Sequence, residues 1–118
     1  MASLTARPLS QDEITALVKK KKDWILGACL PQKVILFGSA ARNEMTEASD
    51  IDLILIFSTM EEQKCAREQL WKTRPDDDWP ADIIFHTTES FRMSCDKGGG
   101  ASWLANREGI VIFEKEKP

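Results

Sequence analysis

Two aspartates separated by one residue, Asp50 and Asp52, head an otherwise apolar segment that reads Leu-Ile-Leu-Ile-Phe. Side chains alternate between the two faces of a β-strand, so both carboxylates would point to one side, about 7 Å apart. Like charges at that separation repel, and a cation between them relieves the repulsion. Oxygen ligands of this kind suit Mg²⁺, with phosphates and water completing its octahedral shell. The alternative is that both carboxylates only end a strand and face water.

A third carboxylate, Asp82, precedes the later apolar segment Ile83-Ile84-Phe85. If the two segments form neighbouring strands, three carboxylates converge on one face of a sheet. Three such groups can hold two divalent ions about 3.5–4 Å apart, which supports in-line displacement at phosphorus. One ion would then hold the triphosphate, the second would activate a hydroxyl, and Asp82 would take the proton. The alternative for Asp82 is a turn residue that follows Pro80.

Gly38 and Ser39 directly follow the apolar run Val34-Ile-Leu-Phe37, and ten residues separate Ser39 from Asp50. A glycine at the end of a strand lets the backbone approach a phosphate, and the helix that follows points amide groups at it. The Ser39 hydroxyl can add one hydrogen bond. Arg42 can contact a phosphate, although a salt bridge to a nearby acid is an equal alternative. These residues predict a phosphate site beside the carboxylates.

Helices and strands must alternate to position these residues. An α/β (α+β) domain is predicted, with helices packed on a small mixed β-sheet of three to five strands. Predicted strands are residues 34–37, 51–57, 81–86 and 110–113, and predicted helices are 11–29, 59–72, 88–93 and 101–108, with a brief helix or turn from Gly38. Ser10 and Glu13 predict a capping box at the first helix. Residues 1–9 are expected to be a loose leader, 10–113 the domain and 114–118 a charged tail.

The composition limits the function further. The 118 residues are enough for one domain, and 42% hydrophobic residues can bury a core. Sixteen basic and nineteen acidic residues give a net charge of −3, which argues against binding nucleic acid through bulk charge. No apolar stretch is long enough to span a membrane. The odd cysteine number and the lack of a CxxC motif favour reduced thiols in a cytoplasmic protein, without zinc.

Two features allow both a structural and a functional interpretation. The run Lys19–Lys22 is expected to be a solvated helix face, and an acidic partner or a triphosphate is the alternative. His86, four residues after Asp82, could reach a nucleotide, but a hydrogen-bonded residue at the strand end is the simpler interpretation.

The spaced motif Gly38-Ser39 and Asp50-Ile-Asp52 resembles the signature of the nucleotidyltransferase superfamily whose core is similar to that of DNA polymerase β. Residues 37–42 (Phe-Gly-Ser-Ala-Ala-Arg) and 49–53 are similar to the minimal nucleotidyltransferase (MNT) group, commonly the antitoxin partners of HEPN-domain toxins. The resemblance covers roughly residues 12–113. At Asn43 the chain departs from the glycine common in the group, and asparagine tolerates left-handed backbone geometry.

This resemblance implies that Gly38, Ser39 and Arg42 bind the nucleotide, and that Asp50, Asp52 and Asp82 are catalytic and bind two Mg²⁺ ions. It implies transfer of AMP from ATP to a hydroxyl, such as a tyrosine of a HEPN toxin, by an antitoxin. Because the core uses nearly the whole chain, the acceptor is expected on another molecule, either a partner protein or a homodimer's second copy. The alternatives are a catalytically silent antitoxin that occludes its partner and a transferase acting on a small-molecule hydroxyl.

Overall fold

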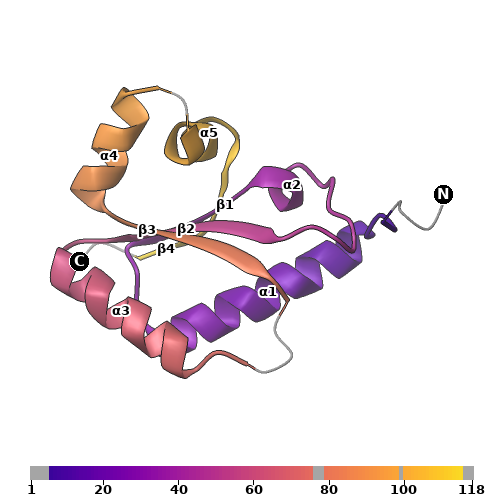
Figure 1. Ribbon diagram of the computed structural model, residues 1–118, viewed down its shortest axis with the longest axis horizontal. Coiled ribbons are helices and arrows are strands. Elements are labelled where there is room, and N and C mark those ends of the chain that lie inside the picture. Colours follow the sequence, from indigo (N-terminus) through magenta and orange to yellow (C-terminus); the bar gives the residue numbers. More distant parts are fainter. Residues whose placement is uncertain (1–5, 76–78, 99, 116–118) are drawn as a thin grey trace.

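A computed structural model describes residues 6–75, 79–98 and 100–115. Helices and strands alternate along this part of the chain, except that two helices follow one another before the final strand (Figure 1). In order they are α1 (Gln11–Ala28), β1 (Lys33–Phe37), α2 (Gly38–Ala41), β2 (Ile51–Phe57), α3 (Met60–Lys72), β3 (Ala81–Thr87), α4 (Thr88–Asp96), α5 (Gly100–Glu108) and β4 (Ile110–Glu114). The predicted elements are all present, and the predicted mixed α+β fold is confirmed.

The strands form one mixed sheet in the order β3-β2-β1-β4. β1 is antiparallel to both β2 and β4, whereas β2 and β3 are parallel. The parallel pair needs a crossover connection, which α3 supplies. β2 and β1 are therefore the central strands, with β3 and β4 at the edges.

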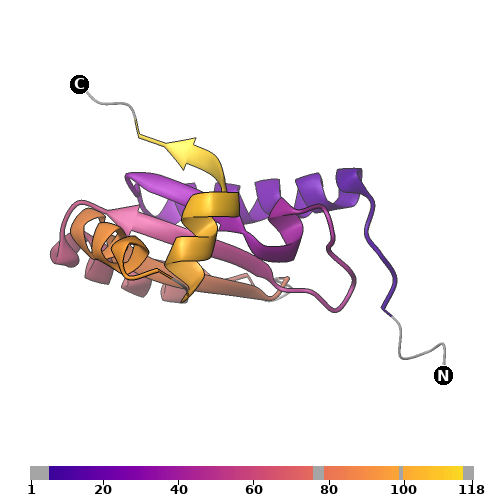
Figure 2. The ribbon, with the colours of Figure 1, turned by 90° about the horizontal axis from the view of Figure 1, so that it is seen from above.

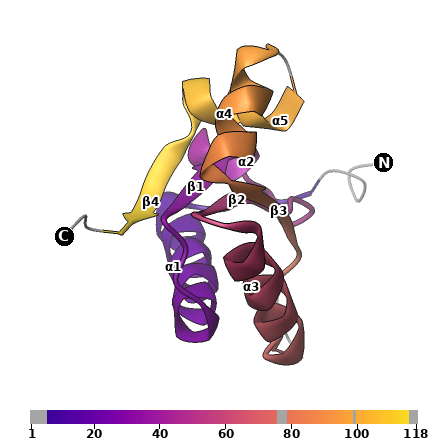
Figure 3. The same ribbon diagram turned by 90° about the vertical axis from the view of Figure 1, so that its left-hand side faces the viewer.

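Helices cover both faces of the sheet. α1 and α3 lie on one face, and α4 and α5 lie on the other (Figure 3). Along β2, Leu53 and Leu55 pack into the α1/α3 core, whereas Ile54 and Ile56 pack with residues of α4 and α5. Both central strands are buried on both faces, as their nearly continuous apolar segments predict. Figure 2 looks down on α4 and α5 above the strands.

The helix starts follow the predicted capping chemistry. The Ser10 hydroxyl accepts from the Glu13 backbone N–H at 3.1 Å, and the Glu13 carboxylate accepts from the Ser10 N–H at 2.9 Å. Thr87 and Ser90 form a reciprocal pair of the same kind at α4, whereas at α3 the Thr59 hydroxyl accepts from the Glu62 backbone N–H without a capping box. Reciprocal bonds of this kind satisfy backbone donors that a helix start leaves unpaired. None of the helices in the described ranges is both long and apolar enough to cross a bilayer.

The run Lys19–Lys22 does not form one solvated face, because Lys21 is only 2% exposed. Its helix position, four residues from both Leu17 and Ile25, places it on the packed side of α1. Its ammonium nitrogen lies 5.2 Å from the centroid of the Trp24 ring. Burial lowers the pKa of Lys21 to about 8. The expectation of four exposed charges is therefore wrong at this position.

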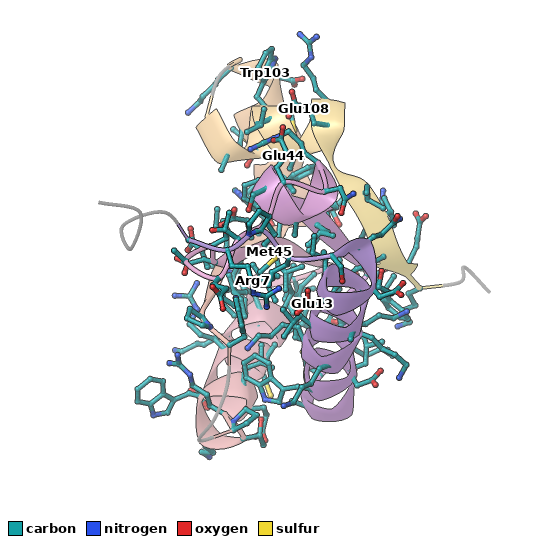
Figure 4. All side chains as sticks on the ribbon, turned by 90° about the vertical axis from the view of Figure 1, so that its right-hand side faces the viewer. Arg7, Glu13, Glu44, Met45, Trp103 and Glu108 are labelled. Carbon is teal, nitrogen blue, oxygen red and sulfur yellow. The ribbon has the colours of Figure 1, made fainter. Side chains whose placement is uncertain are left out.

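Part of the segment expected to be loose is held against the domain. The Leu9 N–H donates to the Met45 carbonyl at 2.9 Å, and Pro8 forms an isolated bridge with Thr46. Arg7 pairs with Glu13 at 3.0 Å (Figure 4). The start of the predicted leader, the acidic run 76–78 and the end of the predicted tail lie outside the described residues.

Candidate functional site

The chemistry-bearing residues meet at one end of the sheet, where β1 ends and where β2 and β3 begin. The antiparallel register places Phe37, next to Gly38, opposite Asp52. The parallel register places Asp52 beside Asp82. Adjacent strands lie about 4.8 Å apart. The order across the sheet is therefore Gly38, Asp52 and then Asp82, so β2 and β3 are neighbours, as convergence of the carboxylates requires.

Gly38 lies directly against the Asp52 carboxylate. A Cβ atom built at Gly38 would overlap Oδ2 of Asp52. Gly38 also has φ +73°, a left-handed conformation that glycine adopts without the steric cost a side chain brings. Two independent constraints therefore require glycine here, and both keep the β1–α2 backbone close to a carboxylate.

The surroundings of Asp52 raise the pKa of its carboxyl group above the ordinary value. Asp52 is partly buried, and this burial raises the pKa of its carboxyl group, with further contributions from the negative charges of Asp82 and then Asp50. The positive charge of Arg42 acts in the opposite direction. Asp50 and Asp82 are themselves exposed. The three carboxylates thus lie close enough to influence one another electrostatically, and the positive charge of Arg42 partly offsets their negative charge.

The donor set suits a hard divalent cation, because it consists of carboxylate oxygens whose mutual repulsion already shifts the pKa of Asp52. Asp50, Asp52 and Asp82 would hold such an ion. Within residues 6–75, 79–98 and 100–115, however, no three histidine, cysteine, aspartate or glutamate side chains are close enough to bind one metal. The register fixes the backbone of Asp52 and Asp82, whereas the exposed side chains of Asp50 and Asp82 must turn inward to complete the ligand set.

The phosphate side of the site contains Ser39 and Arg42. The Ser39 backbone carbonyl accepts from the Glu44 N–H at 2.8 Å, which closes the short α2 turn. The Arg42 Nε–H donates to the Glu44 carboxylate at 2.6 Å, and its guanidinium lies 3.7 Å from the Glu108 carboxylate. Glu44 and Glu108 lie where α2 meets α5 (Figure 4). Arg42 therefore forms the salt bridges that the sequence left as an alternative.

Trp79 contributes to the site in a way that the sequence analysis missed. Its indole N–H donates to the Ser49 carbonyl at 2.9 Å, and the Ile51 N–H donates to the Pro80 carbonyl at 3.0 Å. These bonds join the segment before β3 to Ser49 and to the first residue of β2. The position of Trp79, three residues before Asp82, could have indicated this contact, because an indole N–H inside a fold needs a hydrogen-bond acceptor.

His86 is a structural link between elements. Its two ring nitrogens each lie 2.9 Å from a serine hydroxyl, Nδ1 from Ser90 of α4 and Nε2 from Ser102 of α5. Burial lowers the pKa of His86 below its ordinary value. With both nitrogens bonded inside the fold, His86 joins β3 to α4 and α5, which is the simpler of the two predicted roles.

Comparisons with known proteins identify the family of the chain and a solved structure with a similar fold. The sequence model of a family described as a nucleotidyltransferase domain matches residues 15–108. Among solved structures, the chain resembles the crystal structure of a candidate nucleotidyltransferase from Sulfolobus solfataricus. That alignment has 18% identity and a TM-score of 0.57, and it covers 91% of this chain and 86% of the other. None of the curated proteins matches the chain. At this identity the structural likeness shows a shared fold.

Proposed function

The chain belongs to the nucleotidyltransferase domain family, whose model matches most of its length, and from this premise we propose that it transfers AMP from ATP to a hydroxyl group of a partner protein. The observation that carries the proposal is the order of Gly38, directly after β1, then Asp52 of β2 and Asp82 of β3 across the sheet. This order brings a backbone without side chain, which a phosphate can approach, next to carboxylates that suit a metal.

The reaction forms a bond between the acceptor oxygen and the α-phosphorus of ATP. The bond from that phosphorus to the bridging oxygen of pyrophosphate breaks, and pyrophosphate leaves with the electron pair. Asp82 accepts the hydroxyl proton, because it is the exposed carboxylate on the strand farthest from Gly38. Bound Mg²⁺ would offset the charge of the triphosphate and lower the pKa of the hydroxyl.

Each remaining residue has a role that its surroundings support. Gly38 and Ser39 would bind the phosphates through the backbone and the hydroxyl. Arg42, held by Glu44, would stabilise the negative charge that gathers beside Asp52. Asp50 and Asp52 would hold the metal.

The proposed acceptor is a tyrosine of a HEPN-domain toxin, which would make the chain an antitoxin. The similarity of residues 37–42 and 49–53 to the minimal nucleotidyltransferase group supports this choice.

The test is label transfer with the purified protein, Mg²⁺ and a candidate HEPN partner. ATP labelled at the α-phosphate should label the partner, whereas ATP labelled at the γ-phosphate should not, because that label leaves with pyrophosphate. Asp52→Ala should abolish labelling, and Asp96→Ala, which changes an exposed aspartate at the end of α4, should retain it. Neutralisation of the partner without labelling, equal for wild type and Asp52→Ala, would instead indicate steric occlusion.

A further inference from the structure

The order of residues across the sheet indicates the side from which the acceptor approaches. An in-line displacement places the attacking oxygen opposite the leaving group. If the triphosphate lies at Gly38, pyrophosphate leaves on the β1 side and the hydroxyl arrives on the β3 side, where Asp82 is exposed. This step, like the inference that follows, depends on the proposed function.

β3 is an edge strand with a free side. Among the described strands it pairs with β2 alone, so its outward backbone groups have no strand partner. In Figure 1 it runs in front of β2, with α3 below it and α4 above it. A free strand edge of this kind can add an extended peptide through backbone hydrogen bonds. A small molecule has no repeating backbone groups with which to use such an edge.

A cavity of about 590 Å³ lies beside this edge, between β3 and α3. Its walls include Leu70 and Trp71 of α3 and Ile83 and Phe85 of β3, and Asp82 also contributes. Trp71 is 76% exposed, which is unusual for so large an apolar side chain. Cavities of this size accept a bulky side chain, and exposed tryptophans are frequent anchors of protein interfaces. Of the three candidate ligands, Asp82 alone borders this cavity.

The cavity and the carboxylates belong to opposite faces of β3. Ile83 and Phe85 pack on the α1/α3 side, whereas Ile84 packs on the α4/α5 side, which by alternation is also the side of Asp82. A strand added to β3 alternates in the same way. A side chain in the cavity is therefore separated from one at the carboxylates by an odd number of positions.

We propose that the acceptor is an extended segment of the partner protein that pairs with the free edge of β3. An aromatic side chain of this segment occupies the cavity against Trp71. The acceptor tyrosine lies one or three positions away along the segment and reaches Asp82 on the opposite face.

The activity test uses eight-residue peptides with one tyrosine and one tryptophan on a background of alanine and glutamine. The tyrosine lies one, two, three or four residues from the tryptophan along the peptide, where a separation of one means adjacent residues. With α-labelled ATP and Mg²⁺, separations of one and three should be labelled about tenfold more than separations of two and four, the effect of one good anchor. N-acetyl-tyrosine amide, which has no anchor, reports on transfer alone.

Variants separate the cavity from the chemistry. Trp71→Ala should remove the preference for odd separations. Trp103→Ala should preserve it, because Trp103 lies on α5 against Arg107 and outside the cavity. Circular dichroism should show both variants folded. Equal labelling at all separations, or a preference that survives Trp71→Ala, overturns the docking proposal while transfer itself stands. No labelling of any acceptor by the wild-type protein overturns the proposed function.

Binding provides a readout that does not require turnover. An odd-separation peptide added to the full-length Asp52→Asn variant should shift the backbone amide resonances of Ala81–Thr87 and slow their hydrogen exchange. The other sheet edge, Ile110–Glu114, serves as the internal control and should not respond. Shifts confined to β4, or spread without preference over both edges, contradict docking on β3.

Discussion

The indole N–H of Trp79 donates a 2.9 Å hydrogen bond to the carbonyl oxygen of Ser49, the residue immediately before Asp50. Trp79 itself lies three residues before Asp82. One side chain thus joins the two segments that deliver all three carboxylates to the same end of the sheet. We therefore expect Trp79 to position these groups, although it is not itself a candidate ligand.

Trp79→Phe keeps an aromatic ring but removes the donor. Loss of one partly buried hydrogen bond should lower the free energy of unfolding by about 1 kcal/mol. Transfer should fall more, by about tenfold or greater in kcat, because small displacements of catalytic groups are costly. The KM for ATP should change little, since Gly38 and Ser39 lie on the far side of Asp52. Trp103→Phe is the matched control and should retain the wild-type kcat. If Trp79→Phe also had the wild-type kcat, Trp79 would contribute only packing.

Gly38→Ala should be damaging for two reasons that the structure separates. The added methyl group overlaps the Asp52 carboxylate, and φ +73° is strained for alanine. A loss of about 1–3 kcal/mol in the free energy of unfolding is expected, together with loss of ATP binding. Urea unfolding and calorimetric titration measure the two effects. Gly27→Ala is the control, because it lies in α1 with open space around its Cβ position and should be neutral or stabilising.

Asp52→Asn should stabilise the fold while it abolishes transfer. Burial and the neighbouring aspartates raise the pKa of Asp52 in the folded protein above 3.8. As the pH rises, the Asp52 carboxyl group therefore ionises in the unfolded chain before it ionises in the folded one. The carboxylate therefore lowers stability progressively above pH 3.8, and the asparagine variant should be more stable at pH 7, by less than about 1 kcal/mol at this partly solvated site. The difference in the free energy of unfolding between Asp52→Asn and the wild-type protein should vanish near pH 3, where Asp52 is protonated in both the folded and the unfolded states. A variant less stable than wild type at pH 7 would contradict this account.

The same variant tests the metal site without turnover. Mg²⁺ with a non-hydrolysable ATP analogue should raise the melting temperature of the wild-type protein, because a ligand stabilises the state that binds it. The rise should be much smaller for Asp52→Asn. Asp96→Asn, which changes an aspartate at the end of α4 that is not a candidate ligand, should respond as the wild-type protein does.

His86 should give the fold a pH dependence of its own. Burial lowers the pKa of His86 below 6.5, so both states are neutral at higher pH. As the pH falls through 6.5, the unfolded chain takes up a proton that the folded chain resists, and stability declines. The slope should stay well below the limit of about 1.4 kcal/mol per pH unit for one proton, because the ring is partly solvated. Urea unfolding between pH 7.5 and 5.5 measures this dependence, and the free energy of unfolding of His86→Gln should vary less with pH than that of the wild-type protein. If both proteins showed the same variation with pH, His86 would not contribute to it.

Local patterns were sufficient to predict most of the fold. Val34–Phe37 and Ile51–Phe57 are nearly continuous apolar segments, and both are the buried central strands. The Ser10–Glu13 capping box is also present as predicted. Asn43, in the place of the family's usual glycine, has φ 58° and so adopts the left-handed geometry that asparagine tolerates.

Tertiary relationships account for what the sequence left open. Periodicity could not show that Lys21 would be buried beside Trp24, because a charged run normally indicates solvent. The local sequence around Arg42 could not show that α5 would bring Glu108 within 3.7 Å of its guanidinium. Convergence of Asp52 and Asp82 required the parallel pairing of β2 with β3, which depends on the crossover through α3. Pairings between distant segments leave little trace in local composition.

β4, the last of the described strands, occupies an edge of the sheet beside β1, whose residues precede it by almost eighty positions in the sequence. During synthesis on the ribosome, the segments carrying Gly38, Asp52 and Asp82 therefore emerge well before Ile110–Glu114 can cover β1. Until then the nascent chain presents the apolar strand Lys33–Phe37 with one side unpaired, a surface prone to self-association. Chaperone dependence should accordingly be greatest in the interval between the emergence of β3 and that of β4.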